Sequence, residues 1–188
     1  MQDTETRTDL QRLIDWLKTY TGYNILGNFQ VDYTDQIPSN GAVFPQGLQE
    51  VERTETILGD VTLTNQYNFG LYFTFEKSAE DDVAAKINAD WLMGFQRWVQ
   101  EQNARRLVPN FGNTQTSARA SAQNGQLFSV DGCGTAIYMV TLSVTFEQFY
   151  PDEFKCRNEV KANGKDRTQI HGAFSERELR PGGWNGFV

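Results

Sequence analysis

Residues 61–75 alternate between apolar and polar side chains without a change of register. Seven of the eight odd-numbered positions, from Val61 to Phe75, are apolar, and only Asn65 interrupts them. The even-numbered positions are almost all polar. Because successive side chains of a β-strand point to opposite faces, this stretch predicts a long strand with one apolar face and one polar face. The apolar face must pack against other elements, and the polar face remains for solvent or a partner.

An extended stretch at residues 43–58 precedes this strand, and Gly59 and Asp60 separate the two. A glycine followed by a small polar residue between two extended runs predicts a hairpin with a two-residue type II′ turn. In that hairpin Leu58 lies opposite Val61. The two stretches are therefore expected to pair as one long antiparallel ribbon.

This register also places two carboxylates on the apolar side of the ribbon. It sets Glu52 opposite Tyr67 and Glu50 opposite Phe69. An unpaired carboxylate in an apolar interior is strongly destabilising. We therefore expect the outer part of the hairpin, residues 48–69, to project as an arm that meets a neighbouring chain. There the two glutamates would face a cation or a backbone donor.

Two other stretches repeat apolar residues at helical spacing. Residues 4–20 predict a first helix and residues 80–104 a second, longer one. The expected buried stripe of the second helix consists of Val83, Ile87, Trp91, Phe95, Trp98 and Gln102. Residues 28–33 alternate weakly and predict a short strand between the first helix and the hairpin.

A second hairpin follows the second helix. Residues 116–130 alternate small and polar side chains, and residues 131–134 contain two glycines that favour a turn. Every second position from Ala136 to Phe146 is then apolar, which predicts another long strand with one apolar face.

The order of these elements predicts an α+β fold. We expect an antiparallel sheet of about four to five strands, built from the two long hairpins, with both helices packed on one face. Residues 1–153 would form this single domain, with 10 basic and 20 acidic side chains and a net charge of −10. Residues 154–188 carry 7 basic and 4 acidic side chains, net +3, and predict an extended or flexible C-terminal arm.

No pattern of catalytic or ligand-binding residues is evident in the sequence. His171 is the single histidine, and Cys133 and Cys156 are the only cysteines. Their spacings fit neither a nucleophile with its base nor a metal site. We therefore expect no enzymatic activity, no cofactor and no metal. The polar N-terminus and the absence of a long apolar stretch predict no signal peptide and no membrane span.

Four phrases of the chain resemble the tail-terminator, or tail-completion, proteins of long-tailed bacteriophages, some of which are described as minor capsid proteins. The phrases are EVERTE at Glu50–Glu55, QYNFGLYF at Gln66–Phe73, FQRWVQEQN at Phe95–Asn103 and NGQLFSVDGCGTAIYMVTLSVTF at Asn124–Phe146. The similarity covers about residues 5–150 and reflects the packing of sheet and helices, with no catalytic residue to transfer.

The resemblance implies a structural virion protein at the head–tail interface, assembled in the host cytoplasm. Such proteins form a homohexameric ring that caps the tail tube and ends its polymerisation. Their partners are sister subunits, the tail-tube protein and the head-completion or connector protein. DNA passes through the lumen without specific binding, which suits a net charge of −7.

Other functions are also compatible with the sequence. One is a different head–tail connector or a tail-tube component, and another is a general interaction module. A small enzyme of the acetyltransferase kind is the third, and it would require His171 to act as the catalytic histidine. For the ring, the candidate residues at the subunit interface are Glu50, Glu52, Arg53, Tyr67, Phe69, Trp184 and Phe187.

Overall fold

The computed structural model divides the chain into two compact units, Met1–Pro151 and Asp152–Val188. Nearly all of the second unit lies outside the part of the chain that the structure describes, so the fold below is that of the first. The described residues are 8–22, 24–34, 37–76, 82–130 and 134–152.

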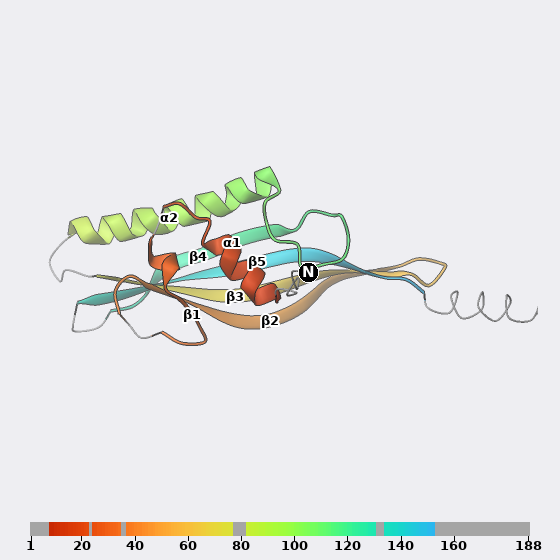
Figure 1. Ribbon diagram of the computed structural model, residues 1–188, viewed down its shortest axis with the longest axis horizontal. Helices are drawn as coiled ribbons and strands as arrows, with labels where there is room; N and C mark the ends of the chain where they lie inside the picture. Colours follow the sequence, from red (N-terminus) through yellow and green to blue (C-terminus); the bar gives the residue numbers. More distant parts are fainter. Residues whose placement is uncertain (1–7, 23, 35–36, 77–81, 131–133, 153–188) are drawn as a thin grey trace, which may run out of the picture. The chain divides into compact units, whose positions relative to one another are not determined.

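The first unit contains two α-helices, one 3-10 helix and five strands among its described residues (Figure 1). In chain order they are α1 (Asp9–Leu17), η1 (Asn24–Gly27), β1 (Phe29–Val31), β2 (Asn40–Glu55), β3 (Val61–Glu76), α2 (Asp82–Arg105), β4 (Arg119–Val130) and β5 (Thr135–Tyr150). The predicted α+β class is confirmed, and so are both long hairpins.

The five strands form one sheet in the order β1-β2-β3-β5-β4. The last strands of the two hairpins, β3 and β5, pair over their whole length, from Val61 opposite Tyr150 to Glu76 opposite Thr135. The short β1 pairs in parallel with residues 41–43 of β2. The sheet is therefore mixed, and the prediction of an antiparallel sheet is wrong at this edge. The local alternation that predicts a strand does not specify its direction.

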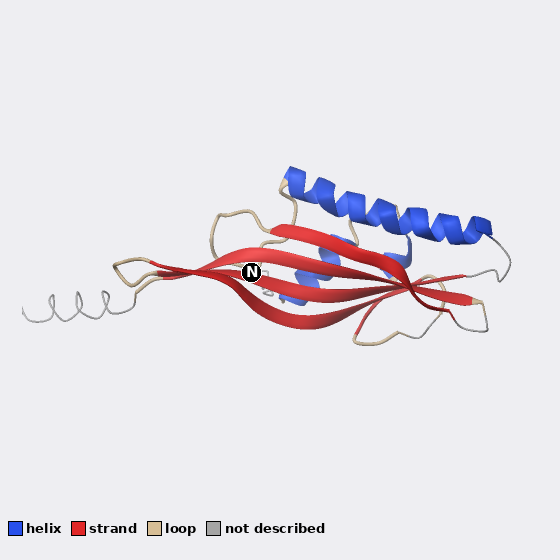
Figure 2. Cartoon of the chain, turned by 180° about the vertical axis from the view of Figure 1, so that it is seen from behind, coloured by secondary structure: helices blue, strands red, loops and turns tan. Residues whose placement is uncertain are grey.

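Both helices pack on the same face of the sheet, and the opposite face is uncovered by any described helix (Figure 2). The odd-numbered residues of β3 point toward the helices, as the alternation predicts. Phe73 is fully buried and lies against the rings of Trp91 and Phe95 of α2, with centroids 4.7 and 5.5 Å apart. Thr8 caps the start of helix α1, and its hydroxyl accepts a hydrogen bond from the Gln11 amide at 3.2 Å.

The buried stripe of α2 differs from the predicted one at its start. Val83 and Ile87 are each 61% exposed. Each four-residue step overshoots a full turn by about 40°, so a stripe built at that spacing turns away from the sheet. The fully or mostly buried positions of α2 are instead Asn88, Leu92, Phe95, Val99 and Gln102.

The turn of the first hairpin is longer than predicted. The Thr56 amide donates to the Asp60 carbonyl at 2.9 Å, and the Gly59 amide donates to the Thr56 carbonyl at 2.9 Å. Gly59 has a φ of 89°. This is typical of a three-residue loop that ends in a left-handed glycine, because only glycine adopts that backbone without strain.

The longer turn and two irregularities in β2 change the register of the ribbon. Glu52 lies opposite Thr64, and Glu50 lies opposite Asn65, so neither carboxylate faces Tyr67 or Phe69. The register shifts between Glu50 and Glu52 and again between residues 45 and 47. Because each shift inserts one residue, Glu50 and Glu52 point to opposite faces of the ribbon.

Candidate assembly site

Three strands continue together beyond the helices, and we call this outer region the arm. It consists of residues 48–64 of the β2–β3 hairpin and residues 147–150 of β5. Its outer end extends past both α1 and α2 (Figures 1 and 2). All β2 side chains from residue 45 onward are exposed. The predicted projection is therefore confirmed for residues 48–64, whereas Asn65 and Phe69, at the inner end of the predicted range 48–69, are buried. The contact with a neighbouring chain stays a prediction.

The arm exposes a group of large apolar side chains. Ile57 at its tip is fully exposed, at 103%. The other exposed apolar residues of the arm are Leu48, Val51, Leu58, Phe149 and Tyr150. Single exposed apolar residues are ordinary on a protein surface, but a group of them marks an interaction site. The arm therefore exposes more large apolar side chains than isolated surface positions would.

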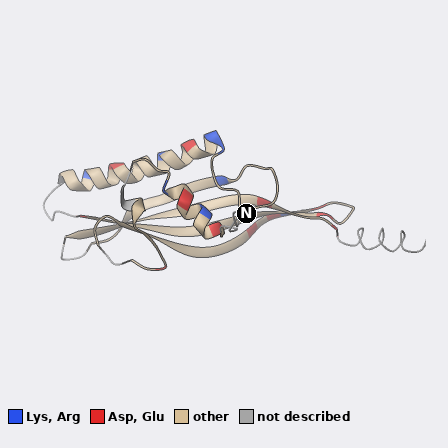
Figure 3. Ribbon diagram, viewed as in Figure 1, with Lys and Arg blue, Asp and Glu red and all other residues tan. Residues whose placement is uncertain are grey.

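The arm is also acidic (Figure 3). Its carboxylates are Glu50, Glu52, Glu55, Asp60 and Glu147, and its single basic residue is Arg53. The guanidinium of Arg53 lies 3.9 Å from the Glu55 carboxylate, with both side chains more than half exposed. A pair so exposed contributes little to stability, so the charge of the arm remains available to a partner.

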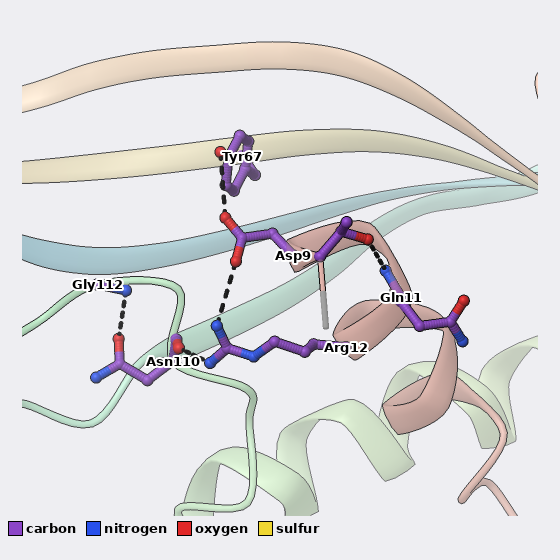
Figure 4. Close-up of polar contacts among 7 residues, drawn as sticks. Asp9, Gln11, Arg12, Tyr67, Asn110 and Gly112 are labelled. Atoms are coloured by element: carbon purple, nitrogen blue, oxygen red, sulfur yellow. Dashed lines mark hydrogen bonds and ion pairs between the residues drawn. The ribbon is translucent and has the colours of Figure 1, made fainter. Parts of the chain in front are cut away.

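A polar network at the start of α1 holds the base of the arm (Figure 4). The Asp9 carboxylate accepts hydrogen bonds from Arg12 at 3.2 Å and from the Tyr67 hydroxyl of β3 at 3.5 Å. Arg12 also donates to the Asn110 carbonyl and stacks over the Phe111 ring at 5.5 Å. One helix therefore ties β3 to the loop that follows α2.

That loop, residues 106–118, is fixed in turn to the last strand. The side chain of Asn113 bonds both the amide and the carbonyl of Phe149, at 2.7 and 2.8 Å. The Thr116 hydroxyl donates to the Glu147 carboxylate at 2.6 Å. The loop thus clasps β5 where the arm begins.

Two grooves lie beside this loop. The larger, of about 830 Å³, runs between the end of α2, the loop and the start of β4, and its two charged lining residues are Arg106 and Arg119. Its other lining side chains are mainly hydroxyls and amides, including Gln115, Ser117 and Ser121. The smaller groove, of about 290 Å³, shares Arg119 and adds Glu52 and Glu147 of the arm.

The larger groove has a rigid wall. The Asn103 side chain of α2 donates to the Ala120 carbonyl at 2.6 Å and accepts from the Ala120 amide at 2.8 Å. This pair fastens the end of the helix to the outermost strand. Neither Arg106 nor Arg119 has an ion-pair partner within 4.0 Å among the residues that the structure describes. The groove is therefore a preformed basic surface.

The uncovered face of the sheet has a different character. Gln66, Asn68, Thr141, Ser143 and Thr145 form its centre, and it carries little charge there. Gln66 donates to the Asn68 side chain at 2.8 Å. At the end away from the arm, Phe44, Tyr72 and Phe128 form an aromatic cluster, with neighbouring ring centroids 5.1 and 5.3 Å apart, in which Phe128 is exposed and the other two rings are partly buried.

The predicted interface residues fall into four groups, the last of which is Tyr67 alone. Glu50, Glu52 and Arg53 lie exposed on the arm. Phe69 is only 5% exposed and belongs to the core, so its side chain is not available to another chain in this structure. Its position in the middle of β3, under the helices, explains this burial. Trp184 and Phe187 lie outside the described residues, as do Cys133, Cys156 and His171.

Tyr67 is half-buried at the boundary between core and arm. Its ring contacts those of Phe69, Phe111 and Phe146, with centroids 5.3 to 6.0 Å apart. Burial raises the pKa of its hydroxyl above 10.0, and the charge and hydrogen bond of Asp9 raise it further. Tyr67 therefore acts within the chain, where it links β3 to α1.

The sequence reasoning missed Arg119 and did not connect it with Arg106. The two residues are 13 positions apart and meet only because the loop returns the chain to the end of α2. Nothing in a linear sequence signals such a meeting.

No family model matches the chain, and no curated protein matches its sequence. None of the described helices is long and apolar enough to cross a membrane. Within the same residues there is no group of three or more His, Cys, Asp or Glu side chains placed to hold a metal ion.

Proposed function

We propose that this protein is a structural virion component that assembles into a ring at the end of a bacteriophage tail. In this role it caps the tail tube, ends its polymerisation and offers the surface to which the head joins. The arm is the single observation that carries the proposal. It continues the sheet beyond the helices and exposes apolar side chains that the described part of the chain leaves uncovered.

The open edges of the sheet give further support. Only residues 41–43 of β2 pair with β1, and within the described residues no strand pairs with the outer part of β2. The outer edge of β4 also lacks a strand partner among these residues, although Asn103 and Gln96 of α2 bond its backbone at Ala120 and Ala122. Unpaired edges at opposite ends of a sheet are suited to heterologous contacts, in which one surface meets a different surface of the next copy. Such contacts generate closed rings or open fibres.

The proposed partners follow from this role. Sister copies, most simply six, form the ring, with the tail-tube protein on one side and the head-completion or connector protein on the other. DNA passes through the lumen without specific binding, because a protein with a net charge of −7 does not attract phosphates in general. The proposed location is the virion, at the head–tail interface, after assembly in the host cytoplasm.

A tail-tube or other connector component is the second candidate. The open edges of the sheet favour it equally, since a heterologous contact that does not close produces a tube or filament. Negative-stain electron microscopy of the purified full-length protein separates the two. We expect single closed rings, whereas long tubes would indicate the tube protein.

The contribution of the arm can be tested with Ile57→Asn/Leu58→Asn. Both side chains are exposed in the hairpin turn, so the free energy of unfolding should change by less than about 0.5 kcal/mol. Ring formation, followed by light scattering after size exclusion and by microscopy, should be lost.

The matched control is Val83→Asn/Ile87→Asn, which replaces two equally exposed apolar residues at the start of α2. This variant should still form rings. Rings that survive the arm substitutions, or that are lost equally in the control, would remove the arm as the basis of the proposal.

A further inference from the structure

We infer that the copies join by inserting the acidic arm of one subunit into the basic groove of the next. This inference rests on the proposed function in one respect, that the protein self-associates, and it names the two surfaces that meet. The occupant of the groove is the arm of a second copy.

The groove has the features of a docking site for an acidic segment. With about 830 Å³ it is large enough for several side chains, and among the described residues that line it only Arg106 and Arg119 are charged. The hydroxyls and amides of the loop add hydrogen-bond donors. Guanidinium groups bind carboxylates through two parallel hydrogen bonds, which makes the pairing directional as well as attractive.

The arm is the most acidic exposed element of the described fold that is shaped to enter such a groove. Its five carboxylates outnumber its single arginine (Figure 3). Its tip carries Ile57 and Leu58, and Leu107 is exposed directly after Arg106 at the end of α2. An arm in the groove therefore brings opposite charges together and also offers these apolar side chains a partner.

The helix dipole is a simpler explanation for arginines near the end of α2, but it accounts for only some of them. Basic residues at a helix C-terminus stabilise the helix dipole, and this accounts for Arg105, the last residue of α2. Arg106 follows the helix with a φ of 57°, which turns the chain out of the helical path. Arg119 begins β4 and lies at no helix end, so the dipole does not explain its place in the groove.

The same chain also supplies two carboxylates near Arg119. Glu52 and Glu147 share the smaller groove with it, but neither forms an ion pair with it within 4.0 Å. The Glu147 carboxylate already accepts the hydrogen bond of Thr116. Glu52 is therefore left unchanged in the experiment below, so that the variants test contacts between copies.

A charge-swap experiment on the full-length protein tests the inference. The groove variant is Arg106→Glu/Arg119→Glu, and the arm variant is Glu50→Lys/Glu55→Lys. Sedimentation velocity over a concentration series should show that each variant alone self-associates about 10- to 100-fold more weakly than the wild type. The wild-type association should weaken as salt is added, because exposed charges are screened.

An equimolar mixture of the two variants provides the decisive measurement. In an alternating assembly each reversed arm meets a reversed groove, and each native arm meets a native groove. The mixture should therefore associate about as strongly as the wild type. Arg106→Glu alone, which leaves the smaller groove intact, should show the same direction of change with a smaller loss.

The matched controls reverse charges on the exposed side of α2, outside both surfaces. They are Lys86→Glu/Arg97→Glu for the groove variant and Asp90→Lys/Glu101→Lys for the arm variant. Both controls should associate like the wild type. An equal loss in the controls would overturn the inference, because it would show an effect of net charge alone.

Three other results would also overturn it. They are a mixture no stronger than its separate components, a wild type that stays monomeric at every concentration, and arginine-dependent binding of duplex DNA with unchanged self-association. Different results would refute the proposed function and the arm-in-groove contact. Rings that persist in the groove variant would refute only the arm-in-groove contact, whereas charge-dependent association into long tubes would refute only the capping ring.

Discussion

The two halves of strand β3 share one sequence pattern, but its apolar face is buried in the inner half and only partly buried in the outer half. From Phe69 to Phe75 the odd-numbered side chains are buried beneath α1 and α2. From Val61 to Leu63 the same alternation continues into the arm, where no described helix covers it and the side chains are only partly buried. The apolar face of a strand must therefore be covered by other residues, and these can come from the same chain or from another.

The boundary between the halves is built by polar groups. Asp9, Arg12 and Tyr67 tie α1 to β3 (Figure 4). Asn113 and Thr116 of the loop after α2 bond β5 at the base of the arm. Such contacts are directional, so they fix where the covered region ends and hold the arm at a defined angle to the body.

The largest effect should come from truncating the covered half. Phe73→Ala removes a fully buried ring that lies against three other aromatic side chains, Phe29, Trp91 and Phe95. The free energy of unfolding, measured by urea denaturation, should fall by about 3–5 kcal/mol.

The comparison variant is Leu63→Ala, on the same face of the same strand but within the arm. It should cost less, about 1–2 kcal/mol in the monomer, because the Leu63 side chain is only partly buried and no described helix packs on it. Equal losses for the two variants would show that the arm is part of the monomer's core.

A smaller effect should come from opening the boundary. Gly112 lies so close to β5 that an added Cβ would fall 1.8 Å from the Glu147 carbonyl oxygen. Gly112→Ala must displace the loop from the base of the arm, and it should destabilise the protein by about 1–3 kcal/mol.

Gly27→Ala is the matched control, because an added Cβ there meets nothing within 4 Å. Its free energy of unfolding should stay within about 0.5 kcal/mol of the wild type. A Gly112 variant as stable as this control would show that the loop does not clasp the arm.

The smallest effect concerns pH at the same boundary. Burial, and then Asp9, raise the pKa of Tyr67, so folding favours its protonated form. This contribution is complete below pH 10 and is lost as the pH rises above it. The free energy of unfolding should therefore decrease above pH 10, and it should decrease less in Tyr67→Phe.

Tyr20, whose pKa burial also raises, leaves a residual dependence in both proteins. Tyr20→Phe separates its share. If the wild type and Tyr67→Phe lose the same free energy of unfolding at alkaline pH, the Tyr67 hydroxyl does not belong to the polar network between core and arm.

Much of the fold could be predicted because it depends on local periodicity. The alternation of residues 61–75 predicts both the strand and its buried face, and the strands at Thr135–Tyr150 and Arg119–Val130 follow by the same reasoning. The register of the first hairpin could not be predicted in this way, because Gly59 ends a three-residue loop and does not begin a two-residue turn. A single glycine is compatible with both types of turn. Which turn forms changes the residue that lies opposite each position along the two paired strands.

The candidate site was predictable in its acidic half only. Glu50, Glu52 and Arg53 lie on the projecting hairpin as expected, whereas Phe69 lies in the core. The basic half required the tertiary structure, since Arg106 and Arg119 are joined by a loop whose path depends on Asn113 bonding to the distant backbone of Phe149 and on Asn110 bonding to Thr114 within the loop.

By itself the sequence determined which side of each long strand is apolar, because the two-residue period of a strand is local and needs no knowledge of the neighbours. Only the tertiary structure decided how far along the strands the helices reach, and hence which part of that apolar face is left on the arm. It also decided that two arginines share a groove. Both outcomes depend on contacts between residues far apart in the chain, and such contacts leave no periodic trace in the sequence.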